Sequence, residues 1–296
     1  MNQHFKDRVA LITGAGGGLG RSHALYLASL GCRLVINDKG ASVLGEGTEN
    51  KAADETVTLI REAGGLAVSN YSSVSEFEGA QEMVETALTH FGRLDIVINN
   101  AGILRDASFK KQTEEDWQKI IDVHLTGSRH VTKAAWDHML QNNYGRIVMT
   151  TSASGLYGNY GQSNYAAAKM GLVGLMNALK EEGAKANVRI NAIAPVAKSR
   201  MTESMLPPDL LSLLDPRFVS PFVAYLASES CAVNGHCYAV GAGRIARVAV
   251  VESKGVKLQT ENNLETIAQQ FASIDDLSEA HPFENMMSAM ASGIIS

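Results

Sequence analysis

The sequence predicts an α/β protein in which helices cover both faces of a parallel sheet. Short, nearly continuous apolar runs alternate with longer amphipathic segments, as expected for strands that crossover helices bury on both faces. A glycine-rich turn follows the first apolar run, and an aspartate ends the second. The 296 residues, 45% of them hydrophobic, are enough for one large domain with a sizeable core.

Seven apolar segments are expected to form the strands, because they are short, rich in branched aliphatic residues and bounded by polar or turn residues. They are residues 9–13, 33–37, 66–69, 94–98, 146–150, 188–193 and 237–240, and 66–69 has the weakest pattern. The longer segments between them have helical periodicity. Helices are therefore expected at about 19–30, 51–63, 76–91, 113–141, 163–186 and 216–228.

Three regions depart from this alternation. Residues 39–50 form a long glycine-rich connection after the second expected strand. Residues 195–215 contain three prolines, and long connections at strand carboxyl ends often cover active sites, so a lid is expected there, with a surface loop as the alternative. Residues 244–296 are polar and methionine-rich. They indicate a C-terminal extension that packs on the same domain, residues 1–243, or on a partner subunit.

The composition argues against several classes of function. A net charge of −5 provides no basic surface for nucleic acid. No apolar stretch approaches the ~20 residues of a membrane span, and the first residues are polar, unlike a signal peptide. The cysteines Cys32, Cys231 and Cys237 are typical of a reducing compartment, and no cysteine or histidine cluster has metal-ligand spacing. A cytoplasmic protein without a metal site is therefore expected.

The first expected strand leads into a turn that suits a dinucleotide. Gly14, Gly18 and Gly20 allow a tight turn and a close approach of phosphates, and the following helix presents N–H donors to a pyrophosphate. Asp38 ends the second strand, where a carboxylate accepts hydrogen bonds from ribose hydroxyls and repels a 2′-phosphate. The pattern favours NAD over NADP. The alternatives are a purely structural turn and a capping aspartate.

Small residues follow the fourth expected strand, where Asn99-Asn100-Ala101-Gly102 lets the backbone run close to a cofactor. An ordinary turn is the alternative for this segment. Further along, Tyr165 and Lys169 are four residues apart, so the phenol and the ammonium share one helix face. A cation beside a phenol favours the phenolate, which is a general base for an alcohol proton. Chance supplies this spacing in many helices, so its meaning depends on the other motifs.

In order and spacing, these motifs resemble the short-chain dehydrogenase/reductase family over about residues 5–243. The matching residues are Thr13-Gly14-x-x-x-Gly18-Leu19-Gly20, Asn99-Asn100-Ala101-Gly102, Ser152, Tyr165-x-x-x-Lys169 and Asn191-x-x-x-Pro195. The resemblance implies a single Rossmann-like domain with a doubly wound, seven-stranded parallel sheet. It also implies NAD(P)-dependent oxidation or reduction at a carbonyl carbon.

The resemblance also implies roles for individual residues. Tyr165 would be the general base, Lys169 would lower its pKa, and Ser152 would hydrogen-bond the substrate oxygen, with a strand-end capping hydroxyl as the alternative for Ser152. His124 stands where the family often has an asparagine whose backbone carbonyl holds a relay water, so it is either a relay member or a helix-packing residue. The implied NAD contacts are Gly14, Gly18, Leu19, Gly20, Asp38, Ser73, Val74, Asn99, Ala101, Gly102, Tyr165, Lys169, Pro195, Ala197, Ser199 and Arg200.

Further segments resemble one branch of this family, the (3R)-hydroxyacyl-CoA dehydrogenase units of type 2 multifunctional enzymes. They include Ile36–Asp38, Ala101–Asp106, Val123–Gly127, Ser154–Asn159 and Val240–Gly243. The branch implies NAD-dependent oxidation of a (3R)-3-hydroxyacyl-CoA to a 3-ketoacyl-CoA. The alternatives are a hydroxysteroid dehydrogenase of the 17β type or another secondary-alcohol dehydrogenase, and, from a different class, a non-catalytic NAD-binding protein. By family analogy the helices at 113–141 and 163–186 would form a homodimer or homotetramer.

Overall fold

A computed structural model describes residues 4–47, 51–197, 214–257 and 263–295 of the chain. The chain divides into two compact units, Met1–Arg247 and Val248–Ser296. Within the described ranges, none of the helices combines the length and apolar character that a bilayer crossing requires.

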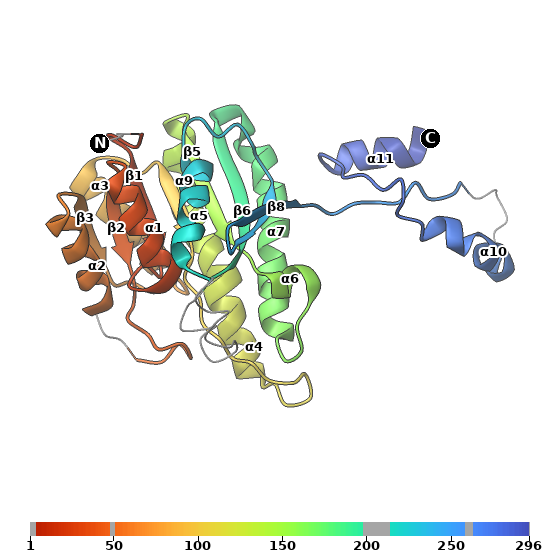
Figure 1. The fold of residues 1–296 in the computed structure, drawn as a ribbon, viewed down its shortest axis with the longest axis horizontal. Helices are drawn as coiled ribbons and strands as arrows, with labels where there is room; N and C mark the ends of the chain where they lie inside the picture. The colour runs from red at the N-terminus through yellow and green to blue at the C-terminus, as the bar shows by residue number, and fades with distance from the viewer. Residues whose placement is uncertain (1–3, 48–50, 198–213, 258–262, 296) are drawn as a thin grey trace. The chain divides into compact units, whose positions relative to one another are not determined.

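The first unit is built on one eight-stranded sheet with the order β3-β2-β1-β4-β5-β6-β7-β8 (Figure 1). The pairs from β3 to β7 are all parallel. The strands are β1 (Val9–Thr13), β2 (Arg33–Asn37), β3 (Leu66–Asn70), β4 (Ile96–Asn99), β5 (Gly145–Thr150), β6 (Val188–Val196), β7 (Cys237–Gly241) and β8 (Arg244–Val248). The seven-stranded parallel sheet expected from the sequence is therefore confirmed, with one further strand.

The eighth strand follows a two-residue turn in which Ala242 and Gly243 both have positive φ. So short a connection returns the chain antiparallel to β7. None of the residues of β8 is buried, so this strand lacks the apolar run that marks the others. Because β8 joins the sheet, the first unit extends to Arg247, four residues beyond the expected end of the domain.

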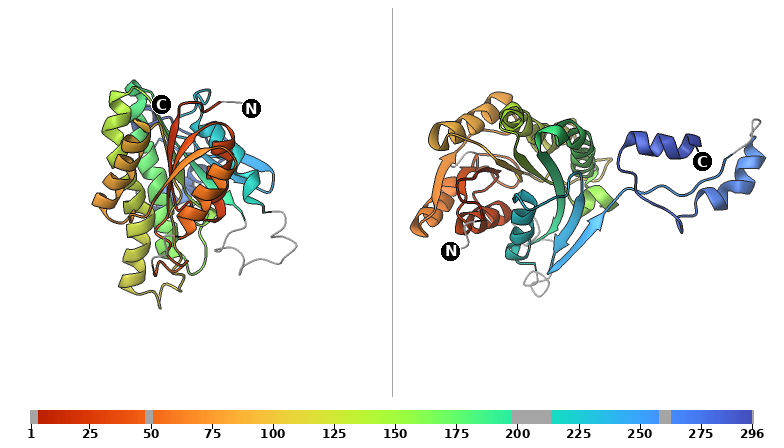
Figure 2. Two further views of the ribbon diagram at one scale, coloured as in Figure 1. Left: turned by 90° about the vertical axis from the view of Figure 1, so that its left-hand side faces the viewer. Right: turned by 90° about the horizontal axis from the view of Figure 1, so that it is seen from above.

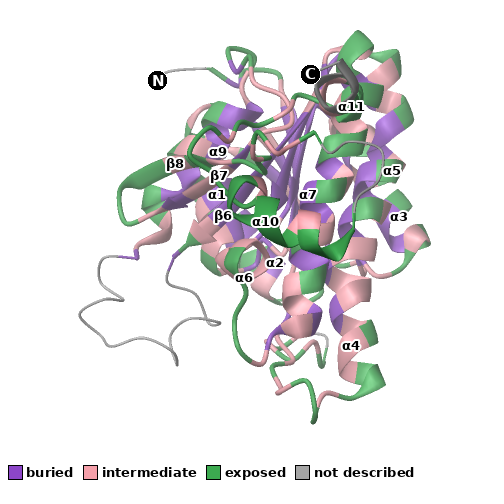
Figure 3. Ribbon diagram, turned by 90° about the vertical axis from the view of Figure 1, so that its right-hand side faces the viewer, coloured by how far each residue is buried: buried purple, intermediate pink, exposed green. Residues whose placement is uncertain are grey.

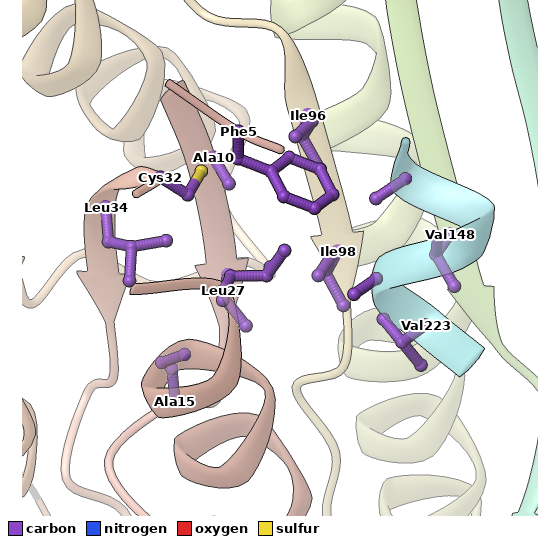
Figure 4. Packing of buried hydrophobic residues seen from close by; sticks show 14 of the residues in the cluster. Phe5, Ala10, Ala15, Leu27, Cys32, Leu34, Ile96, Ile98, Val148 and Val223 are labelled. Atoms are coloured by element: carbon purple, nitrogen blue, oxygen red, sulfur yellow. The ribbon is translucent and has the colours of Figure 1, made fainter. Parts of the chain in front are cut away.

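Helices cover both faces of the sheet, as the sequence predicted (Figure 2). One face carries α1 (Gly18–Ser29), α2 (Lys51–Glu62) and α9 (Ser220–Ala227), and the other carries α3 (Phe77–Phe91), α5 (Gly127–Gln141) and α7 (Ser163–Gly183). Apolar side chains of β1, β2 and β4 pack against α1 and α9, with Phe5 beside them (Figure 4). Figure 3 shows that the interior strands of the sheet are largely buried, whereas the outer sides of the helices are exposed.

The expected helix over 113–141 has an interruption. It begins as α4 (Glu114–Ile120), capped by the Thr113 hydroxyl, passes through a π-helical turn over Ile121–Thr126 and continues as α5. A π turn adds a residue to one turn of helix and recurs at functional sites. The short helix α6 (Ala153–Tyr157), which follows β5, was not predicted.

The second unit contains α10 (Leu264–Ile274), capped by Asn263, and α11 (Met286–Ile295). Main-chain hydrogen bonds between Glu252 and His281 form an isolated antiparallel bridge. None of the side chains described over 248–257 and 263–290 is buried, and Figure 3 shows α10 as largely exposed. The expectation that this extension packs on the same domain or on a partner subunit stays a prediction.

Candidate active site

The strand order reverses at β1, which pairs with β2 on one side and β4 on the other. Ligands of doubly wound folds bind outside the carboxyl ends of the strands at such a point. A cavity of about 540 Å³ lies there, and it is the place where the glycine turn, the tyrosine and the lysine meet. Its lining includes Gly14, Gly18, Leu19, Asp38, Ser73, Val74, Ala101, Gly102, His124, Ser152, Tyr165, Lys169, Pro195 and Ala197.

Two glycines of this turn, Gly14 and Gly20, have no room for a side chain. Gly14 has φ +63°, and a Cβ there would lie 2.8 Å from the Cα of Ala101. A Cβ on Gly20 would lie 2.3 Å from the Gly14 carbonyl oxygen. Gly17 provides no side-chain cap to α1, and the first turn of α1 carries no acidic residue. The N–H groups at this helix end are therefore suited to bind an anion.

Side chains of β1 and of the segment after β4 hold the turn in place. The Thr13 hydroxyl accepts hydrogen bonds from the N–H groups of Asn100 (3.0 Å) and Ala101 (3.1 Å). The Asn100 amide donates to the carbonyl oxygens of Thr13 (2.9 Å) and Gly14 (3.0 Å). This pairing fixes the two chain segments that border the switch point.

Asp38 stands at the end of β2 and lines the cavity. Its carboxylate accepts hydrogen bonds from the N–H groups of Gly16 (2.8 Å) and Gly40 (2.8 Å). These bonds fix the carboxylate beside the glycine turn. A carboxylate oxygen carries more than one lone pair, so both oxygens can also accept from ligand hydroxyls. Together with the open helix end, this geometry fits the phosphates and a ribose of a dinucleotide.

Tyr165 and Lys169 lie on the first turns of α7, and both line the cavity. The Lys169 Nζ donates to the Thr150 carbonyl (2.6 Å) and lies 5.5 Å from the centre of the Tyr165 ring. Burial lowers the pKa of Lys169 to about 7. Burial also raises the pKa of Tyr165, an effect opposed by a hydrogen bond with Ser152 and reinforced by the charge of Asp106. Unless a further positive charge acts on it, the phenol therefore keeps its proton at neutral pH.

Ser152 is the N-cap of α6, where its hydroxyl oxygen accepts the N–H of Ser154 (3.1 Å). The same hydroxyl hydrogen-bonds Tyr165, so a substrate oxygen would share its proton with the phenol oxygen. The Ser154 hydroxyl donates to the Gln162 side chain (2.7 Å), which in turn donates to the Asp106 carboxylate (2.7 Å). Gln162 is buried and lines the cavity. The buried amide thus ties the serine segment to the start of α7.

His124 lies in the π turn with its ring buried at the back of the cavity. Its Nε2 lies 2.8 Å from the Ile103 carbonyl, and its Nδ1 has no partner among the described residues. The ring meets the Tyr165 ring edge-on at a centroid distance of 5.0 Å. Burial, and then the charge of Lys169, keeps the pKa of His124 well below its ordinary value, so the imidazole is neutral. The His124 carbonyl accepts the Ser128 hydroxyl (2.7 Å).

The structure does not bring every predicted residue to the cavity wall. Gly20 and Asn99 lie behind it, and the Asn99 amide donates to the Thr132 hydroxyl (3.0 Å). Ser199 and Arg200 lie outside the described residues, as does most of the expected lid over 195–215. Within the described part of the chain, no group of three or more histidine, cysteine or acidic residues is placed to hold a metal ion.

Sequence reasoning missed Gln162 and Asn164, which hold the start of α7. Asn164 is fully buried, and its Nδ2 donates to the Arg105 (3.2 Å) and Asp116 (3.3 Å) carbonyl oxygens. The available signal was the pair of amide side chains directly before the tyrosine at an expected helix start, where polar side chains satisfy free backbone groups.

Comparisons with known proteins agree with this geometry. A model of the short chain dehydrogenase family matches residues 8–207. A short-chain type dehydrogenase/reductase of Mycobacterium tuberculosis is 50% identical over 275 residues, which cover 93% of this chain and 96% of that protein. Peroxisomal multifunctional enzyme type 2 of Mus musculus is 50% identical over 279 residues, which cover 93% of this chain and 38% of that enzyme. The chain thus spans well under half the length of the mouse enzyme.

Solved structures give the same likeness. The full-length peroxisomal multifunctional enzyme type 2 from Drosophila melanogaster superposes with a TM-score of 0.82 at 40% identity, covering 98% of this chain and 49% of that one. Carveol dehydrogenase from Mycobacterium avium, solved in complex with NAD, superposes with a TM-score of 0.74 at 30% identity, covering 81% of this chain and 98% of that one.

Proposed function

The chain belongs to the short-chain dehydrogenase/reductase family and is an oxidoreductase, and from this premise we propose that it oxidises (3R)-3-hydroxyacyl-CoA to 3-ketoacyl-CoA with NAD+. The observation that carries the proposal is the meeting of Ser152, Tyr165 and Lys169 in one cavity with the glycine turn and Asp38. The likeness to multifunctional enzyme type 2 supports the substrate class, and the NAD complex of carveol dehydrogenase supports the cofactor.

The reaction divides between the cofactor and three side chains. When bound, NAD+ would supply the hydride acceptor and an additional positive charge. The Ser152 hydroxyl donates to the substrate oxygen and holds it near the Tyr165 phenol. Tyr165, as the phenolate, takes the hydroxyl proton while the carbon loses its hydride, which leaves the ketone. In its protonated form Lys169 would favour the phenolate, since a nearby cation opposes the increase in the Tyr165 pKa that burial causes.

His124 would act as a positioning residue in this scheme. Its ring packs edge-on against Tyr165 and is held by the main chain of Ile103. The alternative drawn from the sequence, a relay water on its backbone carbonyl, stays a prediction. That carbonyl already accepts the Ser128 hydroxyl, so a relay water would share the second lone pair.

Cofactor choice is proposed to rest on Asp38, because its carboxylate would face the 2′-phosphate of NADP. Initial rates with NAD+ and NADP+ at equal concentration test this assignment. We expect a clearly higher initial rate with NAD+ than with NADP+, and Asp38→Ser should reduce the ratio of the two rates. Equal rates with both cofactors in the unmodified protein would contradict the assignment.

The substrate proposal is tested by a panel of 3-hydroxyacyl-CoA thioesters of several chain lengths, each as the 3R and the 3S form. NADH formation from the 3R forms is the expected result. Turnover of the 3S forms alone would reverse the proposed stereochemistry. No turnover at any chain length, with NADH still bound, would remove the acyl-CoA assignment and leave the family assignment intact.

A hydroxysteroid or another secondary alcohol is the second candidate substrate, since carveol dehydrogenase is among the structural neighbours. An acyl chain and a steroid both need an apolar cleft with few polar groups. The comparison that separates them is kcat/KM for a 3R-hydroxyacyl-CoA against kcat/KM for a 17β-hydroxysteroid, measured on one preparation.

We further propose that the chain acts as a homodimer or homotetramer through the surfaces of α4, α5 and α7. The extension from residue 244 onward would pack on its own domain or on a neighbouring subunit, because its described side chains have no core of their own. Mass measurement of the full chain in solution tests self-association. Cytoplasmic location stays a prediction that the relatives do not support directly, since several are named peroxisomal.

A further inference from the structure

The long connection after β2 is a folded strap in its described part, Lys39–Gly47. The Ser42 N–H donates to the Glu46 carbonyl (2.8 Å), and the Gly45 N–H donates to the Ser42 carbonyl (2.9 Å). The Ser42 hydroxyl also accepts the Glu46 N–H (3.2 Å). These bonds close a compact turn, so the strap has a defined shape of its own.

The strap is attached to the segment after β4. The Leu104 N–H donates to the Val43 carbonyl (2.9 Å). Gly45, with φ +81°, lies against Ile103, and a Cβ there would be 3.1 Å from the Ile103 Cδ1. Ile103 is buried and is the residue that holds the His124 ring. The strap thus rests on a fixed part of the cavity wall.

Arg105 provides a second attachment through three groups of its guanidinium. Its Nε donates to the Leu44 carbonyl (2.9 Å), one Nη bonds Glu46 (3.0 Å), and the other bonds Asp116 of α4 (3.3 Å). Only 16% of the Arg105 side chain is exposed, so these bonds are partly protected from solvent. The Arg105 carbonyl accepts the Asn164 amide, which anchors the arginine to α7.

The strap also forms part of the cavity itself. Its lining residues are Lys39, Ala41, Ser42, Val43 and Gly45. They follow directly on Asp38, whose carboxylate accepts the Gly40 N–H. Ser152 lies at the N-cap of α6, and Tyr165 and Lys169 lie on α7, on the other side of the switch point. The strap therefore adjoins the part of the cavity that would take the adenosine ribose.

We propose that the strap is a cap over the adenosine half of the cofactor and that Arg105 is the positioning residue that holds it closed. This inference rests on the proposed use of NAD. With the Arg105 bonds in place, the strap is already ordered when the dinucleotide binds, so binding does not have to order it. Without these bonds, binding must also order the strap, and the affinity for any ligand that contains the adenosine half falls.

Arg105→Gln removes the guanidinium group, and with it the positive charge and the hydrogen bonds to Leu44, Glu46 and Asp116. We expect the dissociation constants of NADH and of ADP-ribose to rise together by about tenfold, the equivalent of one or two lost hydrogen bonds. Glu46→Gln removes one partner on an exposed side chain and should raise both by roughly twofold. The matched control is Arg33→Gln, which loses an ion pair to Asp7 at the opposite end of β2 and should change neither.

A second readout follows the strap itself. Trypsin cuts after Lys39, and ADP-ribose should slow that cut in the unmodified protein. In Arg105→Gln the protection should be weaker at equal saturation with ligand. A general loss of structure would instead increase cleavage throughout the chain and lower the melting temperature.

The outcomes separate this inference from the function on which it rests. If the unmodified protein does not bind NADH, the proposed function fails. If it binds NADH, unchanged dissociation constants for NADH and ADP-ribose in Arg105→Gln would show that Arg105 does not hold the strap closed. Loss of NADH affinity with unchanged ADP-ribose affinity, or NADH binding without any ADP-ribose binding, would overturn the cap over the adenosine half.

Discussion

The two ends of the central strands differ in whether their buried polar groups have hydrogen-bond partners. At the amino ends, the buried Asp95 carboxylate accepts bonds from Arg8 (3.0 Å), from Arg93 (2.7 Å) and from the Val9 N–H (2.9 Å). At the carboxyl ends, His124 Nδ1 and Thr150 Oγ1 line the cavity without a partner among the described residues.

Unsatisfied buried polar atoms are costly, so their location is informative. At the amino ends the fully buried Arg146 donates to the carbonyls of Gly145 and Asn187, and the Tyr144 ring lies between Arg146 and Arg8. That end serves stability. The carboxyl end keeps polar groups available to a ligand, which indicates that it serves function.

The largest expected effect is that of Tyr165→Phe at the carboxyl end. Without the phenolate no group takes the alcohol proton, so kcat should fall by about 10³-fold or more, while NADH still binds. Steady-state kinetics and NADH titration measure the two parts. Tyr144→Phe is the matched control at the amino end, because the ring between the arginines is kept, and its kcat should not change. Persistent activity in Tyr165→Phe would show that another group is the base.

The reverse pattern is expected for Asp95→Asn at the amino end. The change leaves Arg8 and Arg93 without their buried counter-charge and should lower the free energy of unfolding by about 3 kcal/mol, at the low end for a broken buried pair because both arginines are partly exposed. Urea unfolding measures it. The kcat and KM of the folded enzyme should stay unchanged. A loss of kcat without a loss of unfolding free energy would show that the amino end also serves function.

The same contrast describes what the sequence could predict. The glycine turn, Asp38 and the Tyr165–Lys169 spacing depend on local order, because strand ends and helix faces follow from apolar periodicity. Gly14, Gly18, Asp38, Tyr165 and Lys169 line the cavity. The seven parallel strands follow from the same periodicity, whereas β8, exposed on its edge, carries no apolar run.

What the sequence could not predict depends on contacts between distant segments. The π turn that carries His124 leaves no signal, since an extra residue in one turn barely changes the apolar pattern of a long helix. Asp106, Ser154 and Asn159 contact Gln162 only after the segment that follows β4, helix α6 and the segment before α7 have folded together. The family resemblance implied that Asn99 contacts the ribose, whereas its amide donates to Thr132 and Asn99 is absent from the cavity lining.

A smaller effect is expected where Gly102 meets His124. A Cβ on Gly102 would lie 2.5 Å from the His124 Cε1, inside contact distance, and the buried ring has little room to move. Gly102→Ala should therefore cost about 2 kcal/mol of unfolding free energy, as for overpacked cores, and should also lower kcat by displacing the ring from Tyr165. Urea unfolding and steady-state rates measure both.

The double variant provides the control for that prediction. His124→Asn shortens the side chain that the new methyl group would strike, so Gly102→Ala should cost less in the His124→Asn background. An equal loss of unfolding free energy in the two backgrounds would mean that Gly102 is required for another reason, such as close approach of a ligand to the backbone.

The smallest effect tests where the contrast ends, because His23 has a buried Nε2 without a partner among the described residues and yet lies outside the cavity lining. Its Nδ1 lies 2.9 Å from the Ser220 hydroxyl, and burial lowers its pKa to about 3.

Between that pKa of His23 and its unfolded value of about 6.5, the unfolded chain binds a proton that the folded chain does not. Unfolding free energy should therefore fall with pH below about 6.5, by up to about 1.4 kcal/mol per pH unit for this one group. His23→Gln should reduce that slope by one proton and leave kcat unchanged. An unchanged slope with reduced kcat would place His23 among the functional groups, and unsatisfied polarity would then mark function on the α1–α9 face of the sheet as well.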